Sequence, residues 1–196
     1  RGSQVETRVY VKIPIERVGV LIGPKGKIKR RIEETSGVDL IIDSETGSVE
    51  IVLSPETSDA SVLMQVQNLV RAIGRGFSPQ RALKLLEEDI YLDIIDLTDH
   101  VGRSKNALER VRGRIIGQNG KAREIIEELT GTAVSIYGHT VSIIGELEDI
   151  QLTKEAILML VKGSFHKTVF NYLYQEREAR KKRLKIWEEP SEKVLK

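Results

Sequence analysis

The sequence predicts an α/β (α+β) fold made of two copies of one unit, each with three strands and three helices. Two observations predict it. A pair of Gly-x-x-Gly loops recurs with the same flanking pattern, and strand-like and helix-like apolar periodicities alternate around each loop. The chain has 196 residues, of which 40% are hydrophobic, so it can bury the cores of two small domains.

The repeat is visible when residues 22–27 (Ile-Gly-Pro-Lys-Gly-Lys) are placed over residues 116–121 (Ile-Gly-Gln-Asn-Gly-Lys), an offset of 94 positions. The same offset aligns the helix, the glycine and the strand behind each loop: Lys29 with Arg123, Gly37 with Gly131 and Ile42 with Ile136. Two glycines recur easily by chance, whereas a matched helix, terminating glycine and strand do not. The chain is therefore interpreted as a tandem repeat.

The elements of the first copy follow from the spacing of its apolar residues. Val9, Val11 and Ile13 alternate with polar residues, which predicts a strand that Pro14 ends. A short apolar helical segment, residues 18–22, leads into the loop, and Gly37 ends the helix that follows it. The remaining elements are strands at 38–42 and 49–53 and a helix opened by Ser54-Pro55-Glu56, with Val62, Val66, Leu69, Val70 and Ile73 on its apolar face.

The second copy repeats this order with one insertion. Its first strand is expected at residues 91–97, and residues 99–107 add about ten positions before the helix that precedes the loop. The later elements are a helix at 122–129, strands at 132–137 and 140–144, and a helix at 147–161.

The segment between the copies is too apolar for a free linker. Ser78-Pro79 starts a short helix in which Ala82, Leu83, Leu85 and Leu86 are apolar, so we expect it to pack between the units and hold them in one orientation. The predicted division is a first domain at 1–76, a packed connecting helix at 77–89, and a second domain with a C-terminal basic helix at 90–196.

The tail after Gly163 combines apolar and basic residues. Phe165, Val169, Tyr172 and Leu173 extend the apolar pattern into a charged helix. Its cations suit either a solvated helix end or a phosphate contact, and they are Arg177, Arg180, Lys181, Lys182, Arg183 and Lys185. Trp187 suits either a packing anchor or a partner contact.

Positive charge is local to the two loops. The chain carries 31 Lys and Arg against 29 Asp and Glu, so its net charge of +2 indicates no partner by itself. Residues 17–32, however, contain six cations and no acid, and residues 103–123 contain seven cations with Glu109 as the one acid. Glycines allow close approach of a sugar-phosphate chain, and the N–H groups of the next helix favour phosphate. The pattern is typical of a nucleic-acid backbone site.

Residues 22–28 and 116–121 resemble the signature of the KH domain, and the predicted βααββα order matches its type I, eukaryotic topology. The resemblance implies that each loop clamps about four single-stranded nucleotides while the bases lie in an aliphatic groove. An aromatic content of 5% agrees, because it leaves few rings for stacking platforms.

The tandem arrangement resembles a narrower family. Two KH units joined by residues 72–79 and the helix at 82–86 are similar to the archaeal ribosome-biogenesis KH family that partners the Nob endonuclease (the dimethylase-interacting KH proteins), over most of residues 8–187. The resemblance implies non-catalytic binding of single-stranded RNA at the 3′ end of small-subunit rRNA, beside the endonuclease that trims it. Two alternatives stay open: another RNA target, in decay or transcription, and a scaffold in which one unit contacts protein, for instance the endonuclease or a translation factor.

The expected RNA-binding residues are those of both loops and their flanks. In the second unit they are Arg112, Arg114, Ile115, Ile116, Gly117, Gln118, Asn119, Gly120, Lys121 and Arg123, with Ile136 beside the bases; in the first they are Gly23, Pro24, Lys25, Gly26, Lys27 and Lys29. Pro24 removes one backbone N–H that the second loop keeps. We therefore expect the second unit to read sequence and the first to be a further RNA contact or a protein surface.

The sequence favours neither catalysis nor a cofactor. It lacks Cys, and His100, His139 and His166 do not share a metal-ligand spacing. Residues 74–76 (Gly-Arg-Gly) lack the further glycine of a dinucleotide loop, and residues 23–26 lack a Walker ending. We expect no enzyme activity, cofactor or metal.

The sequence has no apolar run near the roughly 18 residues of a membrane span, so we expect a cytoplasmic protein. The chain begins without Met, and we expect a native extension before Arg1.

Overall fold

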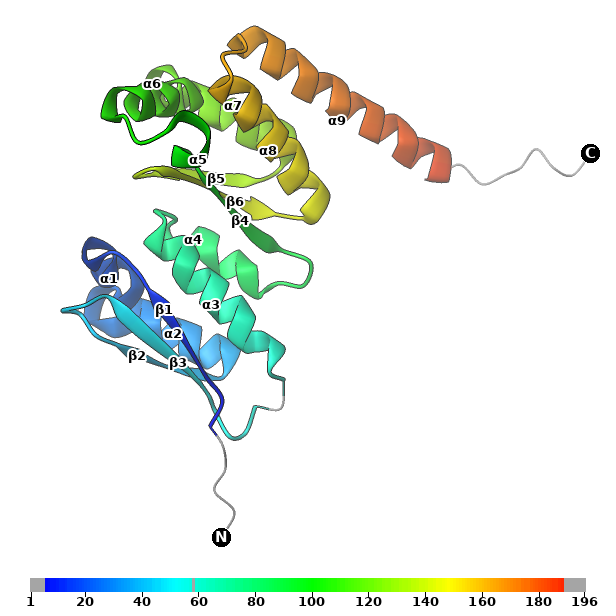
Figure 1. The fold of residues 1–196 in the computed structure, drawn as a ribbon. Helices are drawn as coiled ribbons and strands as arrows, with labels where there is room; N and C mark the ends of the chain where they lie inside the picture. Colours follow the sequence, from blue (N-terminus) through cyan, green and yellow to red (C-terminus); the bar gives the residue numbers. More distant parts are fainter. Residues whose placement is uncertain (1–5, 58, 189–196) are drawn as a thin grey trace, which may run out of the picture.

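The computed structural model describes residues 6–57 and 59–188, which form two units one above the other with a long helix at the end (Figure 1). The first unit contains β1 (Arg8–Lys12), α1 (Ile15–Ile22), the 3₁₀ helix η1 (Pro24–Gly26), α2 (Lys27–Ser36), β2 (Val38–Ile42), β3 (Ser48–Leu53) and α3 (Ser61–Gly74). The second unit contains β4 (Tyr91–Asp96), α5 (Thr98–Val101), α6 (Lys105–Ile116), the 3₁₀ helix η3 (Gln118–Gly120), α7 (Lys121–Thr130), β5 (Ala133–Tyr137), β6 (Thr140–Gly145) and α8 (Leu147–Val161). The predicted βααββα order and the C-terminal helix, α9 (His166–Glu188), are confirmed.

Each unit is built on a three-stranded antiparallel sheet whose central strand is the last in sequence. The strand orders are β1-β3-β2 and β4-β6-β5. Alternation decides the buried face: Val49 and Ile51 of β3 point into the first core, and Val141 and Ile143 of β6 point into the second. Three helices of each unit cover that face of its sheet (Figure 1).

Helix α3 begins later than its sequence predicts. The proposed start at Ser54-Pro55-Glu56 is wrong, because Thr57 N donates to Ser54 O at 2.9 Å and closes a turn there. The Thr57 hydroxyl then donates to Gly37 O at 3.0 Å, and Asp59 Oδ1 accepts from Ser61 N at 2.9 Å. Ser54 therefore starts a turn, and the side chain of Asp59 bonds to the first residue of the helix instead.

The insertion in the second unit is largely helical. It supplies α5 and an extra first turn of α6, whose N-cap Ser104 accepts from Ala107 N at 3.4 Å. The side chain of Asp96 accepts from the Thr98 hydroxyl at 2.6 Å and from Thr98 N at 2.9 Å, and these two hydrogen bonds lower the pKa of Asp96 to about 2.

The second sheet packs its other face against the first unit. Ile144 of β6 belongs to the first unit's core, and Leu92 and Ala133 beside it are partly buried against the same cluster. Polar contacts continue along this face: Ser135 Oγ donates to Arg75 O at 2.9 Å, and the Arg75 guanidinium lies 5.1 Å from the centre of the Tyr137 ring. The units therefore have one fixed arrangement, with α3 and the connecting segment between the two sheets (Figure 1).

The connecting segment comprises α4 (Pro79–Ala82) and the 3₁₀ helix η2 (Leu83–Leu86). Ala82 and Leu85 join the first core. The Arg81 side chain reaches across to Glu127 of the second unit. The segment thus packs on one unit and contacts the other.

Helix α9 packs on its own unit through Val169 and Leu173, which are fully buried. The expectation that Phe165 continues this apolar face is wrong, because Phe165 lies directly before the helix and is 80% exposed. Trp187 is also exposed, so within the described residues it is no packing anchor.

Substituting Ile144→Ala should lower the free energy of unfolding by about 2–5 kcal/mol, because a side chain that is 2% exposed leaves a cavity at the joint of the two units. Urea unfolding followed by circular dichroism measures this value. Ile41→Ala is the matched control, since Ile41 is a strand isoleucine that is 53% exposed and should change stability by no more than about 0.5 kcal/mol. Equal effects would contradict the described packing.

Candidate nucleic-acid interface

The two Gly-x-x-Gly loops have the same backbone conformation despite their different middle residues. Gly23 has φ 72° and ψ 175°, and Gly117 has φ 74° and ψ 176°. The third loop residues are both left-handed, with φ 54° at Lys25 and φ 56° at Asn119. The repeat in sequence is therefore also a repeat in loop geometry.

The first glycine of each loop is required by contact as well as by its positive φ. A Cβ on Gly117 would lie 2.5 Å from the Cβ of Ala122, and one on Gly23 would lie 2.4 Å from Cγ1 of Ile28. The second glycine, Gly120 in the second loop, has a positive φ of 76° but open space where its Cβ would be. The first glycine therefore lets the loop pack closely against the next helix, and the second leaves the loop backbone accessible.

The middle residues distinguish the two loops. Asn119 tolerates its left-handed conformation more readily than Lys25, because asparagine is enriched there. Gln118 keeps the backbone N–H that Pro24 lacks, and both Gln118 and Asn119 expose side-chain amides. Helices α2 and α7 start directly after the loops without a side-chain cap on their first N–H groups.

An unpaired edge of β5 lies beside the second loop. Val134 N donates out of the sheet to Glu127 Oε1 at 3.2 Å. In an antiparallel pair such outward residues alternate, so Ile136 also directs its N–H and C=O away from β6. The edge of β5 therefore offers backbone donors and acceptors that can pair with a base.

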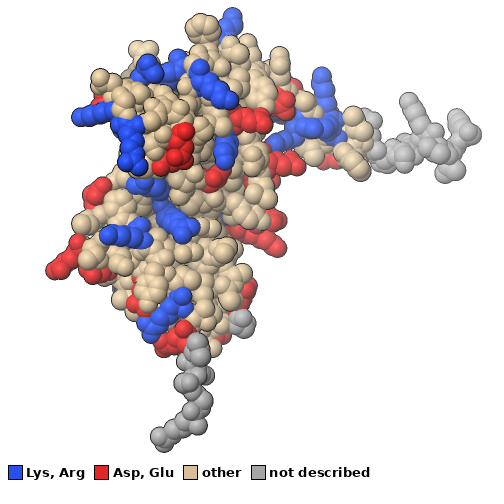
Figure 2. All heavy atoms as spheres, viewed as in Figure 1, with Lys and Arg blue, Asp and Glu red and all other residues tan. Residues whose placement is uncertain are grey.

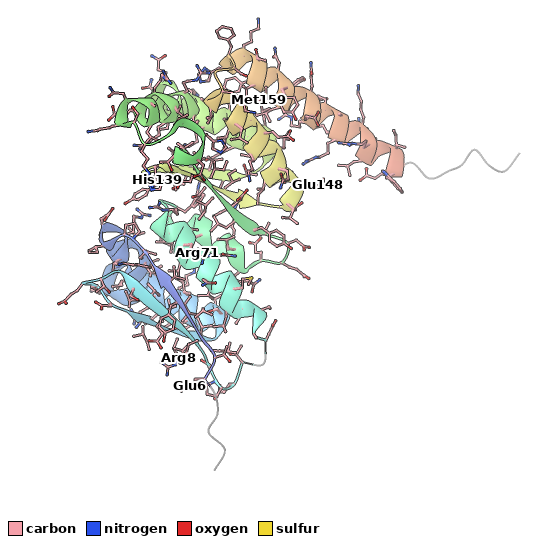
Figure 3. The ribbon with its side chains drawn as sticks, viewed as in Figure 1. Glu6, Arg8, Arg71, His139, Glu148 and Met159 are labelled. Atoms are coloured by element: carbon pink, nitrogen blue, oxygen red, sulfur yellow. The ribbon has the colours of Figure 1, made fainter. Side chains whose placement is uncertain are left out.

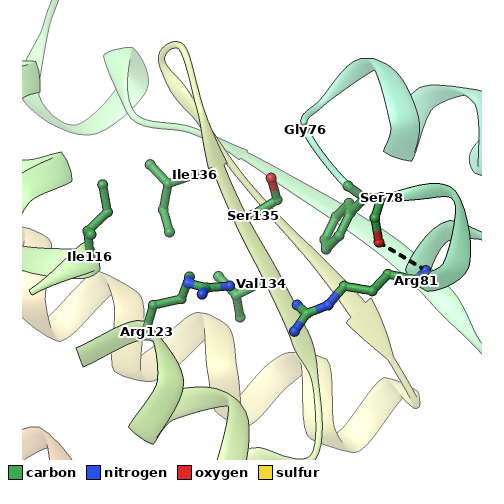
Figure 4. A pocket seen from close by; sticks show the side chains of 9 residues that line it. Gly76, Ser78, Arg81, Ile116, Arg123, Val134, Ser135 and Ile136 are labelled. Carbon is green, nitrogen blue, oxygen red and sulfur yellow. Dashed lines mark hydrogen bonds between the residues drawn. The ribbon is translucent and has the colours of Figure 1, made fainter. Parts of the chain in front are cut away.

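A hollow of about 450 Å³ lies along this edge (Figure 4). Its lining includes Ile116 and Ile136, which are predicted to lie beside the bases, and Arg123 lies at its side. Sequence reasoning missed the other lining residues: Gly76, Phe77, Ser78, Arg81, Val134 and Ser135. Strand alternation could have placed Val134 and Ser135, whereas no sequence signal brings the connecting segment there.

Two of the expected site residues are placed elsewhere. Ile115, expected to border the groove, is fully buried in the second core, because the helical period turns it away from Ile116. Arg114 donates from Nε to Leu160 O at 3.0 Å and from Nη2 to Ser164 O, so its guanidinium caps the carbonyl end of α8. Arg17 does the same in the first unit, with Ile73 O at 2.8 Å and Phe77 O at 2.9 Å.

The remaining cations surround the loops. Lys25, Lys27 and Lys121 are exposed, Lys29 is half-buried, and Arg112 is half-buried with an Nε that has no hydrogen-bond partner within the described residues. Figure 2 shows Lys and Arg side chains over the second unit and across the waist between the units. The overall charge is near neutral, so this grouping comes from where the Lys and Arg residues are placed and not from an excess of positive charge in the whole chain.

Arg123 and Arg81 share one carboxylate. Arg81 donates from Nη1 and Nη2 to the two oxygens of Glu127, each at 3.0 Å, and Arg123 Nη1 donates to Glu127 Oε1 at 2.9 Å. The hydrogen bonds with Glu127 raise the pKa of Arg81. Both guanidiniums are therefore held beside β5 (Figure 4).

Other polar clusters of the structure lie away from the loops. His139 Nδ1 is 2.9 Å from Asp96 Oδ1 at the waist, and Arg8 pairs with Glu6 at the far end of the first sheet (Figure 3). Within residues 6–57 and 59–188, no three His, Cys, Asp or Glu side chains are grouped to hold a metal ion. None of the helices in those ranges has the length and apolar character that a membrane crossing needs.

Each unit combines a three-stranded sheet with a Gly-x-x-Gly loop between two helices. This combination defines the KH domain, so the protein is built from two KH domains. Family models agree: residues 8–65 match the KH domain, and residues 91–178 match a eukaryotic-type (type I) KH domain. A KH domain-containing protein of Methanocaldococcus jannaschii is 44% identical over 93% of this chain and 80% of its own length. The chain belongs to the PNO1/Dim2 family of tandem KH proteins.

More distant relatives and solved structures support this assignment. The pre-rRNA-processing protein pno1 of Aspergillus fumigatus is 31% identical over 82% of this chain, which spans 64% of that relative. Dim2p of Pyrococcus horikoshii OT3 is 50% identical, with a TM-score of 0.82 over 86% of this chain and 99% of its own. A crystal structure of an a/eIF2alpha, aDim2p and rRNA complex from the same organism contains a chain that is 48% identical, with a TM-score of 0.85 over 89% of this chain and 96% of its own.

Substituting Gly117→Ala should destabilise the protein more than Gly120→Ala. Gly120 is in the left-handed helical region, which costs an alanine about 1–2 kcal/mol. Gly117, with ψ 176°, lies in a region open essentially to glycine alone, and a new Cβ there would also collide with Ala122. We expect a loss of about 1–2 kcal/mol for Gly120→Ala and a clearly larger one for Gly117→Ala, measured by urea unfolding. Equal losses would mean that the first glycine is not needed for packing.

Substituting Arg114→Ala should lower the free energy of unfolding by about 1–3 kcal/mol, because two carbonyl oxygens lose a charged donor. It should leave the salt dependence of RNA binding unchanged. Lys121→Ala should leave the free energy of unfolding nearly unchanged and reduce the salt dependence of RNA binding, since Lys121 is exposed beside the loop. Unfolding titrations and RNA-binding titrations on the two variants separate these roles. If Arg114→Ala reduced the salt dependence of RNA binding, Arg114 would be a phosphate contact after all.

Proposed function

We propose that this chain is a non-catalytic single-stranded RNA-binding protein that uses both Gly-x-x-Gly loops. The observation that carries the proposal is the pair of loops with one backbone conformation, each followed by an uncapped helix and surrounded by cations. Phosphates would lie against Gly117 to Gly120 and the start of α7, with Lys121 and Arg123 supplying charge. The bases would lie over Ile116 and Ile136.

The proposed target is the 3′ end of small-subunit rRNA during processing of its precursor. Relatives named as pre-rRNA-processing proteins and a solved complex of aDim2p with rRNA support it. The same complex contains a/eIF2alpha, which supports a translation factor as protein partner. The trimming endonuclease as a partner and a cytoplasmic location remain predictions. A role in RNA decay or transcription is the alternative that base preference would reveal.

The first unit is proposed to be a second RNA contact, with Gly23, Pro24, Lys25, Gly26, Lys27 and Lys29 around the phosphates. A second candidate function for this unit is contact with protein. It is favoured by the open face of the first sheet, where Tyr10 and Ile41 are exposed on either side of Glu50. Such a unit would act as a scaffold while the second unit holds RNA.

Fluorescence anisotropy with a labelled RNA copying the 3′ end of small-subunit rRNA, beside a scrambled RNA, tests the function. The parent protein should prefer the rRNA sequence, and Gln118→Asp with Asn119→Asp should abolish that preference, because carboxylates repel phosphate. Pro24→Asp with Lys25→Asp should weaken binding and keep the preference.

The salt dependence separates RNA contact from protein contact in the first unit. On a single strand, log affinity falls with log salt by about 0.7 for each phosphate neutralised. The Pro24 and Lys25 double variant should reduce the slope if the first loop binds phosphate. An unchanged slope would make the first unit a protein surface, and a parent protein that cannot distinguish the two RNAs would refute the rRNA target.

A further inference from the structure

One wall of the second unit's groove does not belong to its KH fold. Ile116, Arg123 and the outward edge of β5 form one side of the hollow. Gly76 and Ser78, which lie between α3 and α4, and Arg81 of α4 form the other side (Figure 4). The groove is therefore a composite of the second unit and the segment that follows α3.

Arg81 has donors left for a ligand in this groove. A guanidinium carries five N–H groups, and Arg81 uses one hydrogen of Nη1 and one of Nη2 on Glu127. The remaining hydrogens and Nε–H are available on a side chain that is 40% exposed. Arg123 likewise commits one Nη1 hydrogen to Glu127 and lines the hollow from α7.

Glu127 fixes both arginines in place. Its side chain is 15% exposed and accepts from Arg81, Arg123 and Val134 N, so it ties the connecting segment to α7 and β5. The first unit has the same carboxylate at Glu33, which accepts from Leu40 N at 3.0 Å. No arginine in the described part of the chain pairs with Glu33, so the arginine pair distinguishes the second groove.

We propose that Arg81, together with Arg123, recognises a base in the second groove that presents adjacent acceptors on its edge, guanine or cytosine, with Glu127 as the positioning residue. This inference rests on the RNA binding proposed above. Guanine offers O6 and N7 and cytosine offers O2 and N3, whereas the amino group of adenine would meet N–H donors. A hollow of about 450 Å³ lies within the size range of ligand sites, about 300–1,000 Å³.

The test uses the full chain, the labelled RNA copying the 3′ end of small-subunit rRNA, and copies in which each guanine or cytosine is replaced in turn by adenine. For the parent protein, at least one replacement should weaken binding about tenfold or more. Arg81→Ala should bind the original RNA about tenfold or more weakly and should no longer respond to that replacement. Its response to the other replacements should persist.

Lys84→Ala is the matched control, because it removes one positive charge from the same segment outside the hollow. It should keep every base preference. Arg81→Lys preserves charge but loses the planar fork, so it should also lose the preference and decides the question if Arg81→Ala does not fold.

The outcomes separate this inference from the function itself. A parent protein that binds no RNA would refute both. Unchanged base preferences in Arg81→Ala and Arg81→Lys would refute only the role of Arg81. Uniformly weaker binding with a salt slope reduced by about 0.7 would assign Arg81 to a phosphate, which also overturns base recognition.

Glu127→Gln tests positioning. Removing a negative charge beside RNA should by itself tighten binding to every sequence. If Glu127 orients the arginines, the variant instead loses the same base preference as Arg81→Ala. Tighter binding with preferences intact would show that Glu127 does not position them.

Discussion

A sheet that carries helices on one face exposes its other face to water. In the second unit, the first unit covers that other face. Ile144 lies in the core of the other unit, and Leu92 and Ala133 pack beside it. Separating the units would expose this apolar surface, so their arrangement is a consequence of hydrophobic burial. The connecting segment has to lie along β5 for the same reason, and the composite groove exists only because of it.

A fixed arrangement of the units also fixes the distance between the two glycine loops. Two linked sites increase affinity for one RNA strand only when the strand can reach both. With a rigid joint, the spacing of the loops therefore decides which RNA strands could contact both of them. The other face of the first sheet carries the exposed side chains of Tyr10 and Ile41.

Arginine serves the fold as well as the charge of the site. Arg17 and Arg114 close the carbonyl ends of α3 and α8 in the two units, although they stand at different distances from their loops. Arg81 and Arg123 share Glu127. Counting cations along the chain thus overstates the phosphate contacts, because a guanidinium near a loop in sequence can point into the protein.

The sequence by itself determined the repeat, the order of elements and the two loops, because periodicity and glycine act over a few neighbouring residues. The resemblance to the KH domain assigned Ile116, Ile136 and Arg123 to one predicted site. It could not show that helix α3 starts at Ser61, that Ile115 is buried or that Arg114 caps α8, because each depends on partners far along the chain. Only the tertiary structure brought Arg81 to Glu127 and so made the second groove from both parts of the molecule.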